Sequence, residues 1–250
     1  MDYSIIVYIV FGILPSLIWL LYYLTKDLHP EPKRMIIKIF LLGAFITLPV
    51  FFVQVGLTNL LAFLKINPPS TLYSILYWFL VISFSEEFLK YLVVRIKVVD
   101  NPCLDEPLDI MLYMVVSALG FATVENILYL FTPVGDMSLS QLINRTLMVD
   151  LIRFVGATFL HTLCSAAIGY SMAIAFLKMK SRRLLVFLGI LMGVVLHGLY
   201  DFSIMTLDGN AKFIVPGTLI VILAILVFWG FAVLRNMKSI CEVKLKKIKK

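Results

Sequence analysis

Seven long apolar runs, each bounded by charged residues or by proline, dominate the sequence. A helix that crosses a bilayer needs about 20 predominantly apolar residues, and each of these runs is long enough. The predicted spans are residues 3–24, 35–64, 71–94, 107–131, 147–177, 184–206 and 213–234. The pattern therefore predicts an all-α fold, a polytopic membrane bundle of about seven transmembrane helices.

The second run, residues 35–64, is longer than one crossing requires and contains Pro49. Proline removes a backbone hydrogen bond and clashes with the preceding turn of a helix. The run could therefore be one kinked, tilted helix or two shorter segments around a re-entrant bend. We keep it as one crossing, because a full split would place the cations between residues 26 and 38 outside the cell.

The composition agrees with a membrane protein: 61% of the residues are hydrophobic and 15% are charged, and the mean hydropathy is +0.99. Soluble domains have about half apolar and a quarter charged residues. No polar stretch is long enough for a separate soluble core, which excludes nucleic-acid-binding and dinucleotide-binding modules. We expect one membrane-embedded domain, residues 1–235, followed by a basic tail, residues 236–250. The first run lacks the basic start and the cleavage pattern of a signal peptide, so we expect a retained helix.

The distribution of the net charge of +7 predicts the orientation. If the N-terminus lies outside, most lysines and arginines fall in cytoplasmic segments, and only Lys65, Arg145 and Lys212 lie in segments on the opposite side. The positive-inside rule then favours an N-out, C-in, multi-pass protein of the cell membrane. The tail contains most of the seven basic residues between Arg235 and Lys250. It is expected to rest on anionic lipids, with a solvated, featureless tail as the alternative.

Two further features of the sequence, its cysteines and its longest connection, are expected to have no special structural role. Cys103, Cys164 and Cys241 have no paired spacing, so neither a disulfide nor a CxxC metal site is expected. Residues 132–146 form the longest connection, which we interpret as a loop rather than as a gate for another chain.

The third run contains an unusual concentration of charge, the sequence EEFLK at 86–90. On a helix, Glu86 and Glu87 both lie beside Lys90, four and three residues later. One ammonium cannot neutralise two carboxylates in a low dielectric, so one carboxyl is expected to retain a proton. Such a group suits general acid or base catalysis near neutral pH.

Further polar residues follow in the next three runs. The fourth contains Glu125, the fifth contains Arg153 and His161, and the sixth places His197 and Asp201 one helical turn apart. Ionisable groups within spans cost at least a few kcal/mol and by default face a partner inside the bundle. The Glu–Lys pair of the third run and the His–Asp pair of the sixth could each be structural. The occurrence of ionisable residues on four successive spans, however, predicts one functional site. Glu86, Glu87, Glu125 and His197 are expected to meet in one polar cavity.

Small residues accompany these motifs and are expected to bring helices into close contact. They are Ala118, Gly120 and Ala122 in the fourth run, and Gly189 and Gly193 in the sixth.

Three chemistries could use these polar residues. His161, His197 and carboxylates could bind zinc, a glutamate could activate water without metal, or the acids could relay protons or ions. We favour the metal-free site, with no cofactor, because the histidines lack HExxH spacing and Lys90 adds positive charge beside the carboxylates. As nucleophiles, Ser83 and Ser85 lack an assigned base, and Cys164, one turn from His161, is a weak alternative.

Three ordered motifs resemble those of one known family. EEFLK at 86–90, FATVEN at 121–126 and HGLYD at 197–201 are similar to the EExxK, FxxxE and HxxxD motifs of PrsW-type intramembrane proteases. The resemblance covers about residues 75–205. That family is distantly similar to type II CAAX prenyl endopeptidases and to bacteriocin-immunity membrane proteins, whose motifs run EExxxR, FxxxH and HxxxN. Lys90, Glu125 and Asp201 depart from those motifs, so their mechanism transfers only in outline, and His161 becomes the leading additional candidate.

The resemblance implies hydrolysis of a peptide bond in a single-span or membrane-associated protein, such as a membrane-anchored anti-sigma factor. It implies Glu86 as general base, with Glu87 second, and Glu125 as the residue that holds water or shuttles a proton. His197, oriented by Asp201, would stabilise the oxyanion, and Lys90 would keep the carboxylates from being jointly protonated. Zinc is the alternative cofactor. The alternative function is a non-enzymatic proton- or ion-coupled transporter, although the sequence lacks the internal repeats common in transporters.

Overall fold

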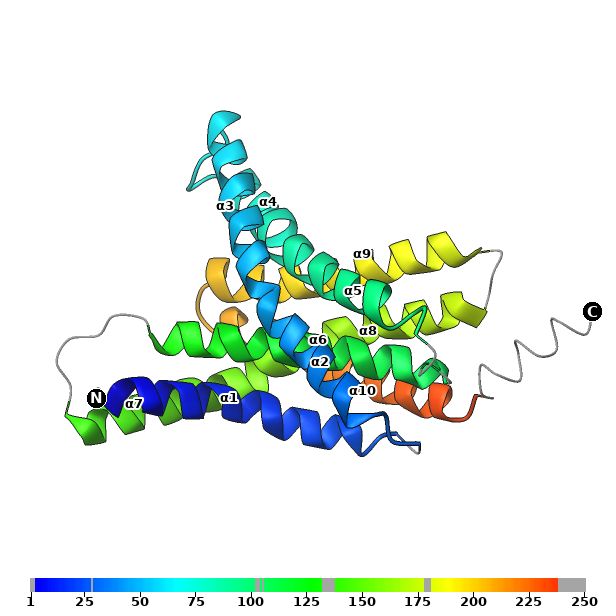
Figure 1. Ribbon diagram of the computed structural model, residues 1–250. Helices are drawn as coiled ribbons and strands as arrows, with labels where there is room; N and C mark the ends of the chain where they lie inside the picture. The colour runs from blue at the N-terminus through cyan, green and yellow to red at the C-terminus, as the bar shows by residue number, and fades with distance from the viewer. Residues whose placement is uncertain are drawn as a thin grey trace, which may run out of the picture.

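The computed structural model describes residues 3–27, 29–101, 104, 106–131, 138–177 and 181–237. Over these residues the regular structure is entirely helical (Figure 1). The predicted all-α class is therefore confirmed. Cys103, Cys241 and the tail from residue 238 onwards lie outside the described residues.

Seven helical units of the described chain are long and apolar enough to cross a membrane. Three of them combine several elements: α2 with α3, α4 with η1 and α5, and α7 with η2 and α8, where η denotes a π-helical segment. The elements are α1 (Tyr3–Leu24), α2 (Lys33–Phe45), α3 (Thr47–Phe63), α4 (Thr71–Leu76), η1 (Tyr77–Phe84), α5 (Ser85–Lys97), α6 (Pro107–Leu130), α7 (Leu139–Arg153), η2 (Phe154–Thr158), α8 (Phe159–Leu177), α9 (Arg182–Thr206) and α10 (Ala211–Arg235).

The second span is one crossing, interrupted between α2 and α3 at Ile46, whose backbone remains helical. Pro49 lies in the first turn of α3. Its ring faces the carbonyl four residues earlier, at Phe45, where α2 ends, so the interruption relieves the clash expected of proline. Lys33–Phe63 is therefore one helical unit, long and apolar enough for the single crossing predicted, and it forms no re-entrant bend.

The fifth span begins earlier than predicted. Ser138 caps α7 by accepting a hydrogen bond from the backbone N–H of Gln141, whose side chain bonds back to the Ser138 N–H. Residues 139–146, which we expected to be loop, are therefore helical; residues 132–137 lie outside the described part of the chain. The predicted start of the fifth span was wrong because polar residues obscured the apolar pattern there. The capping box that starts the helix depends on only two side chains and is therefore a weak signal in the sequence.

The centre of the bundle is α6, which is buried along most of its length (Figure 1). It crosses α2 so closely that a Cβ at Gly43 would overlap the backbone carbonyl of Ser117, and one at Gly120 that of Phe40. The close approach predicted around Gly120 is confirmed.

The Gly189 and Gly193 spacing also brings two helices together, α9 against α8. A Cβ at Gly193 would lie 2.6 Å from the side chain of Ile168, and one at Gly189 would meet Ser171. This contact fixes the position of the helix that carries the HGLYD motif.

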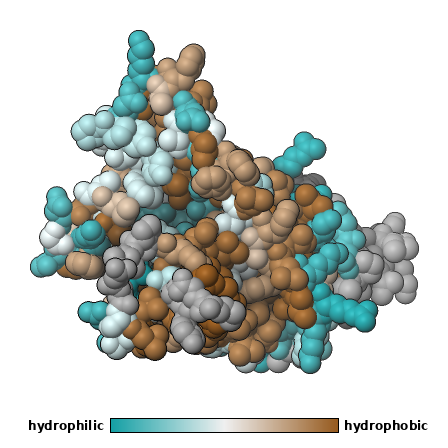
Figure 2. Space-filling view, turned by 60° about the vertical axis from the view of Figure 1, so that its left-hand side comes forward, coloured by the Kyte–Doolittle hydropathy of each residue, from teal (hydrophilic) through white to brown (hydrophobic). Residues whose placement is uncertain are grey.

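The outer surface is suited to lipid. Apolar side chains cover most of the middle of the view in Figure 2, and hydrophilic ones gather towards its edges and tip. In Figure 1 the hairpin of α3 and α4 rises away from the other helices, and α5 descends obliquely from it across the bundle. This inclination carries Glu86 to the level of residues on α6, α8 and α9.

Candidate active site

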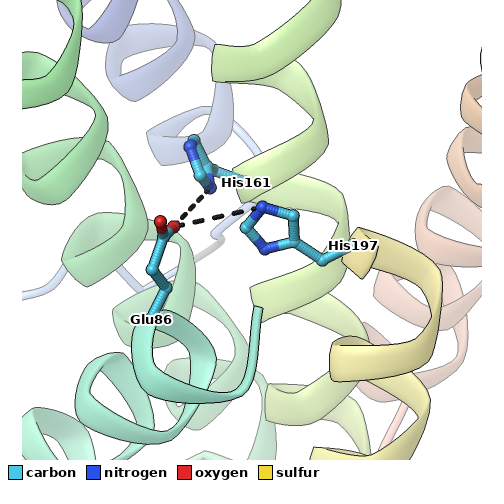
Figure 3. A group of neighbouring side chains, drawn as sticks. All are labelled: Glu86, His161 and His197. Carbon is cyan, nitrogen blue, oxygen red and sulfur yellow. Dashed lines mark ion pairs between the residues drawn. The ribbon is translucent and has the colours of Figure 1, made fainter. Parts of the chain in front are cut away.

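Three side chains from three helices converge at the centre of the site. Glu86 on α5 points towards the imidazole rings of His161 on α8 and His197 on α9 (Figure 3). Its Oε2 atom lies 3.9 Å from His161 Nδ1 and 4.0 Å from His197 Nε2. One possible metal-ligand atom from each residue, a carboxylate oxygen or a ring nitrogen, lies within 4.8 Å of the other two.

Lys90 lies behind this group and is completely buried. Its ammonium lies 2.8 Å from Glu87 Oε1, 3.4 Å from Glu86 Oε2 and 2.9 Å from His161 Nδ1. Each of its three N–H groups therefore has an acceptor, as a buried ammonium requires. The ammonium also lies 4.2 Å from the centre of the Phe121 ring, a favourable cation–π distance.

His197 lies between two carboxylates. Its Nδ1 atom donates to Glu87 Oε1 at 3.0 Å, and its Nε2 atom lies 3.3 Å from Asp201 Oδ2. Ser165 donates to the other oxygen of Glu87 at 2.8 Å. Glu87 thus shares with Asp201 the role of orienting His197, which the resemblance implied for Asp201 alone.

Glu125 is bound to both His161 and Arg153. His161 Nε2 and Arg153 Nη2 each donate to Glu125 Oε2 at 2.8 Å. Arg153 also donates from Nε to Asn126 Oδ1 at 2.6 Å and lies over the Tyr129 ring. The sequence drew attention to Arg153 as a charge within a span but assigned it no role in the site.

A short π-helical segment precedes Glu86 and another precedes His161. In η1, Ser83 donates to the carbonyl five residues earlier, at Trp78, and the Ser85 hydroxyl also bonds to its own helix. In η2, the carbonyl of Phe154 accepts a hydrogen bond from the Trp19 indole of α1. Each segment alters the direction in which the following side chains point, as π-bulges often do at functional sites. Both serine hydroxyls are thus engaged with backbone.

A cavity of about 560 Å³ opens beside the converging side chains. Its polar wall includes Gln54, Glu86, Glu125, Arg153, His161, His197 and Asp201, and its apolar wall includes Trp78, Ile82, Ile152, Leu160, Ile204 and Met205. Glu86, Glu125 and His197 thus meet at one cavity, as expected. Glu87 and Lys90 do not line it, because they lie in the layer behind Glu86 and His197.

Gln54 is a residue of the site that the sequence did not reveal. It reaches the site from α3, where its Nε2 donates to Glu86 Oε1 at 3.3 Å. An amide in a span is a weak signal, because it carries no charge. Cys164, the weak nucleophile candidate, is a buried free thiol that does not line the cavity.

The charges of this cluster do not balance if every acid is ionised and both histidines are neutral. Four carboxylates (Glu86, Glu87, Glu125 and Asp201) face two cations, Lys90 and Arg153. Because buried net charge is costly, the cluster should hold two further positive charges, as two protons or as one divalent cation.

Comparison with known proteins assigns the family. The family model of the PrsW family intramembrane metalloproteases matches residues 31–234. The chain is 30% identical to a protein named Protease PrsW from Geobacillus kaustophilus over 78% of each chain. It is 30% identical to Protease PrsW of Bacillus subtilis, over 82% of this chain and 86% of that one.

A third relative, Protease PrsW of Oceanobacillus iheyensis, is 29% identical over 91% of this chain and 94% of its own. No solved structure matches. The motif residues Glu86, Glu125 and His197 meet in space, and the family match covers all of them. The chain belongs to the PrsW family of intramembrane proteases.

Proposed function

We propose that this protein hydrolyses a peptide bond of a membrane-anchored protein in the cavity beside Glu86, His161 and His197. The observation that carries the proposal is the convergence of one carboxylate and two imidazoles on that cavity. Activation of water for peptide hydrolysis needs a base or a metal beside groups that stabilise the developing negative charge.

The family description implies a metal, and the three converging residues fit zinc. One carboxylate and two histidines form a ligand set found in catalytic zinc sites. The separations of 3.9 and 4.0 Å are near the roughly 3.4 Å between ligand atoms in a tetrahedral zinc site. The other ring nitrogen of each histidine contacts a carboxylate, Glu125 or Glu87, as in the outer shell of many zinc sites.

We therefore propose Glu86, His161 and His197 as the residues that would hold zinc, in place of the metal-free site favoured by the sequence. The sequence lacks the HExxH spacing that would place two histidines on one face of a helix. The two histidines are instead directed at one point from different helices. A divalent ion would also supply the two positive charges that the cluster needs. The ion would compete with the Lys90 ammonium for the atoms that both contact; the shortest contact of this ammonium is to Glu87. When bound, zinc polarises a carbonyl and makes a water nucleophilic at neutral pH.

Glu125 is the residue that we propose to carry the proton. It lines the cavity with a side chain that is 23% exposed, whereas Glu87 is completely buried. His161 and Arg153 hold its Oε2 atom, and no described residue bonds to Oε1, which leaves that oxygen for water or the leaving amine. Asp201, 22% exposed beside His197, is the second acid within reach of a substrate.

The position of the cavity favours a substrate that arrives through the lipid. Ile152 and Met205 line the cavity and are also strongly exposed on the apolar surface. The cavity lies towards the ends of α6 and α9 that contain Tyr129 and Met205. With the N-out, C-in orientation in the cell membrane that the positive charges favour, this is the outer half of the bilayer. A membrane-anchored anti-sigma factor that is cut near the outer end of its transmembrane segment could reach the cavity by this route.

The proposal can be tested by comparing protein N-termini in cells that express the wild-type chain or Glu86→Gln. We expect new N-termini, near the outer ends of transmembrane segments, only with the wild type. Purified protein in detergent should then cleave a peptide of the same sequence. Proton flux in liposomes without cleavage would instead support the ion-coupled transporter.

A further inference from the structure

A second cavity lies between the opposite ends of the same helices. It has a volume of about 940 Å³, and residues of α5, α6, α8 and α9 line it, together with the segments next to their ends. We call it the basic groove. Its apolar lining includes Phe88, Tyr91, Ile110, Met172, Phe187 and Ile190.

Three arginines line the groove where the helices end. Arg95 lies in the last turn of α5, and Arg182 and Arg183 begin α9. Arg95 donates to Asp100 at 3.0 Å, so part of its charge is compensated. No described carboxylate pairs with Arg182 or Arg183, and the described lining contains no acidic residue. The groove therefore has surplus positive charge at one end.

The groove continues into a surface that faces lipid. Leu184 and Phe187 line it and are 59% and 60% exposed. The arginines stand at the first and last turns of spans, which is the level of lipid head groups. Apolar walls below a cluster of arginines are complementary to an amphiphile with a negatively charged head. A free phosphate would use only the arginines and would leave the apolar walls uncovered.

We propose that the basic groove binds an anionic phospholipid. Its phosphate lies against Arg182 and Arg183, and an acyl chain packs along Phe88, Tyr91 and Ile190. Basic pockets between transmembrane helices bind anionic head groups in this way. The site is separate from the basic tail and does not depend on the proposed peptidase activity. It joins α5 and α9, the helices that carry Glu86 and His197.

Lipid binding can be measured on the full chain in detergent by native mass spectrometry. Phosphatidylglycerol and phosphatidylcholine with the same acyl chains are added in turn to the wild type and to the double variant Arg182→Gln, Arg183→Gln. Each cation near a head group contributes about a fivefold preference, so the double variant should bind phosphatidylglycerol about 25-fold more weakly. The wild type should prefer phosphatidylglycerol to phosphatidylcholine.

A matched control removes two exposed cations from the same side of the bundle. Arg34 and Lys38 on α2 do not line the groove, so Arg34→Gln, Lys38→Gln should retain wild-type binding. Equal binding of the two lipids, an unchanged double variant, or an equal loss in the control would each overturn the proposal. Displacement of the bound lipid by excess inorganic phosphate would overturn the assignment to a lipid in favour of a free anion.

Discussion

Arg153 and Glu125 form an ion pair of 2.8 Å between α7 and α6, at the wall of the cavity. The same Glu125 oxygen accepts a hydrogen bond from His161 Nε2. Arg153 therefore determines the position of a carboxylate that in turn orients one of the two site histidines. This relationship connects three helical elements of two spans, α6 in one and α7 and α8 in the other, and makes Arg153 a positioning residue for the proposed reaction.

Replacing Arg153 should weaken cleavage by displacing Glu125. Arg153→Gln should lower kcat/KM about 10- to 100-fold, which is the usual effect of losing a residue that helps to orient a metal-binding side chain. Arg153→Lys should restore part of the activity, because it returns the charge without the contact to Asn126. Peptide cleavage is the measurement, and Arg145→Gln on the same helix is the control. Equal activity of Arg153→Gln and the wild type would show that Glu125 needs no support from α7.

Glu86→Gln should reduce cleavage at least about 100-fold while leaving the protein folded, because the amide keeps the shape and loses the negative charge. Asp208→Asn, on the exposed turn between α9 and α10, is the matched control. Bound zinc should also decrease in Glu86→Gln if Glu86 is a ligand. Retained zinc with lost activity would return Glu86 to the role of general base.

Zinc itself can be tested by elemental analysis of purified protein before and after treatment with a chelator. We expect about one zinc per chain, loss of cleavage on chelation and recovery on adding zinc. The variant His161→Gln should bind less zinc than the wild type. Full activity of chelated, zinc-free protein would instead support water activated by glutamate alone.

Narrowing the lipid-facing side of the cavity should discriminate between substrates. Ile152→Trp adds bulk at an exposed position of the cavity wall. We expect cleavage of a membrane-anchored substrate to decrease more than cleavage of a short soluble peptide. Ile225→Trp, exposed on α10, is the control. An equal decrease for the two substrates would contradict access through the lipid.

The α2–α6 crossing should tolerate no side chain. Gly120→Leu would force the backbones of α2 and α6 apart, whereas a Cβ added at Gly56 meets no atom within 4 Å, so Gly56→Leu is the control. We expect a loss of several kcal/mol in unfolding free energy for the first variant and little change for the second. Thermal unfolding in detergent measures the difference, and similar midpoints would show that the helices can separate without cost.

Much of the fold follows from the sequence, because crossing a bilayer constrains the chain strongly. Long apolar runs must form helices that satisfy their own backbone, which determined the seven spans. The single crossing around Pro49 was also predictable, because the distribution of cations along the chain decided between the alternatives. The small residues Gly120 and Gly193 indicated close contacts between helices. The start of α7 was not, because a polar, amphipathic first turn does not look like a span.

The sequence by itself also indicated most of the charged residues that meet at the site, because charges in spans require partners. Only the tertiary structure decided which partner each one has. Glu87 contacts His197, Arg153 contacts Glu125, and Gln54 reaches Glu86. These pairings depend on the rotation and tilt of whole helices and on the π-helical turns before Glu86 and His161. Such rotations arise from packing between distant segments, which the order of residues along one span does not express.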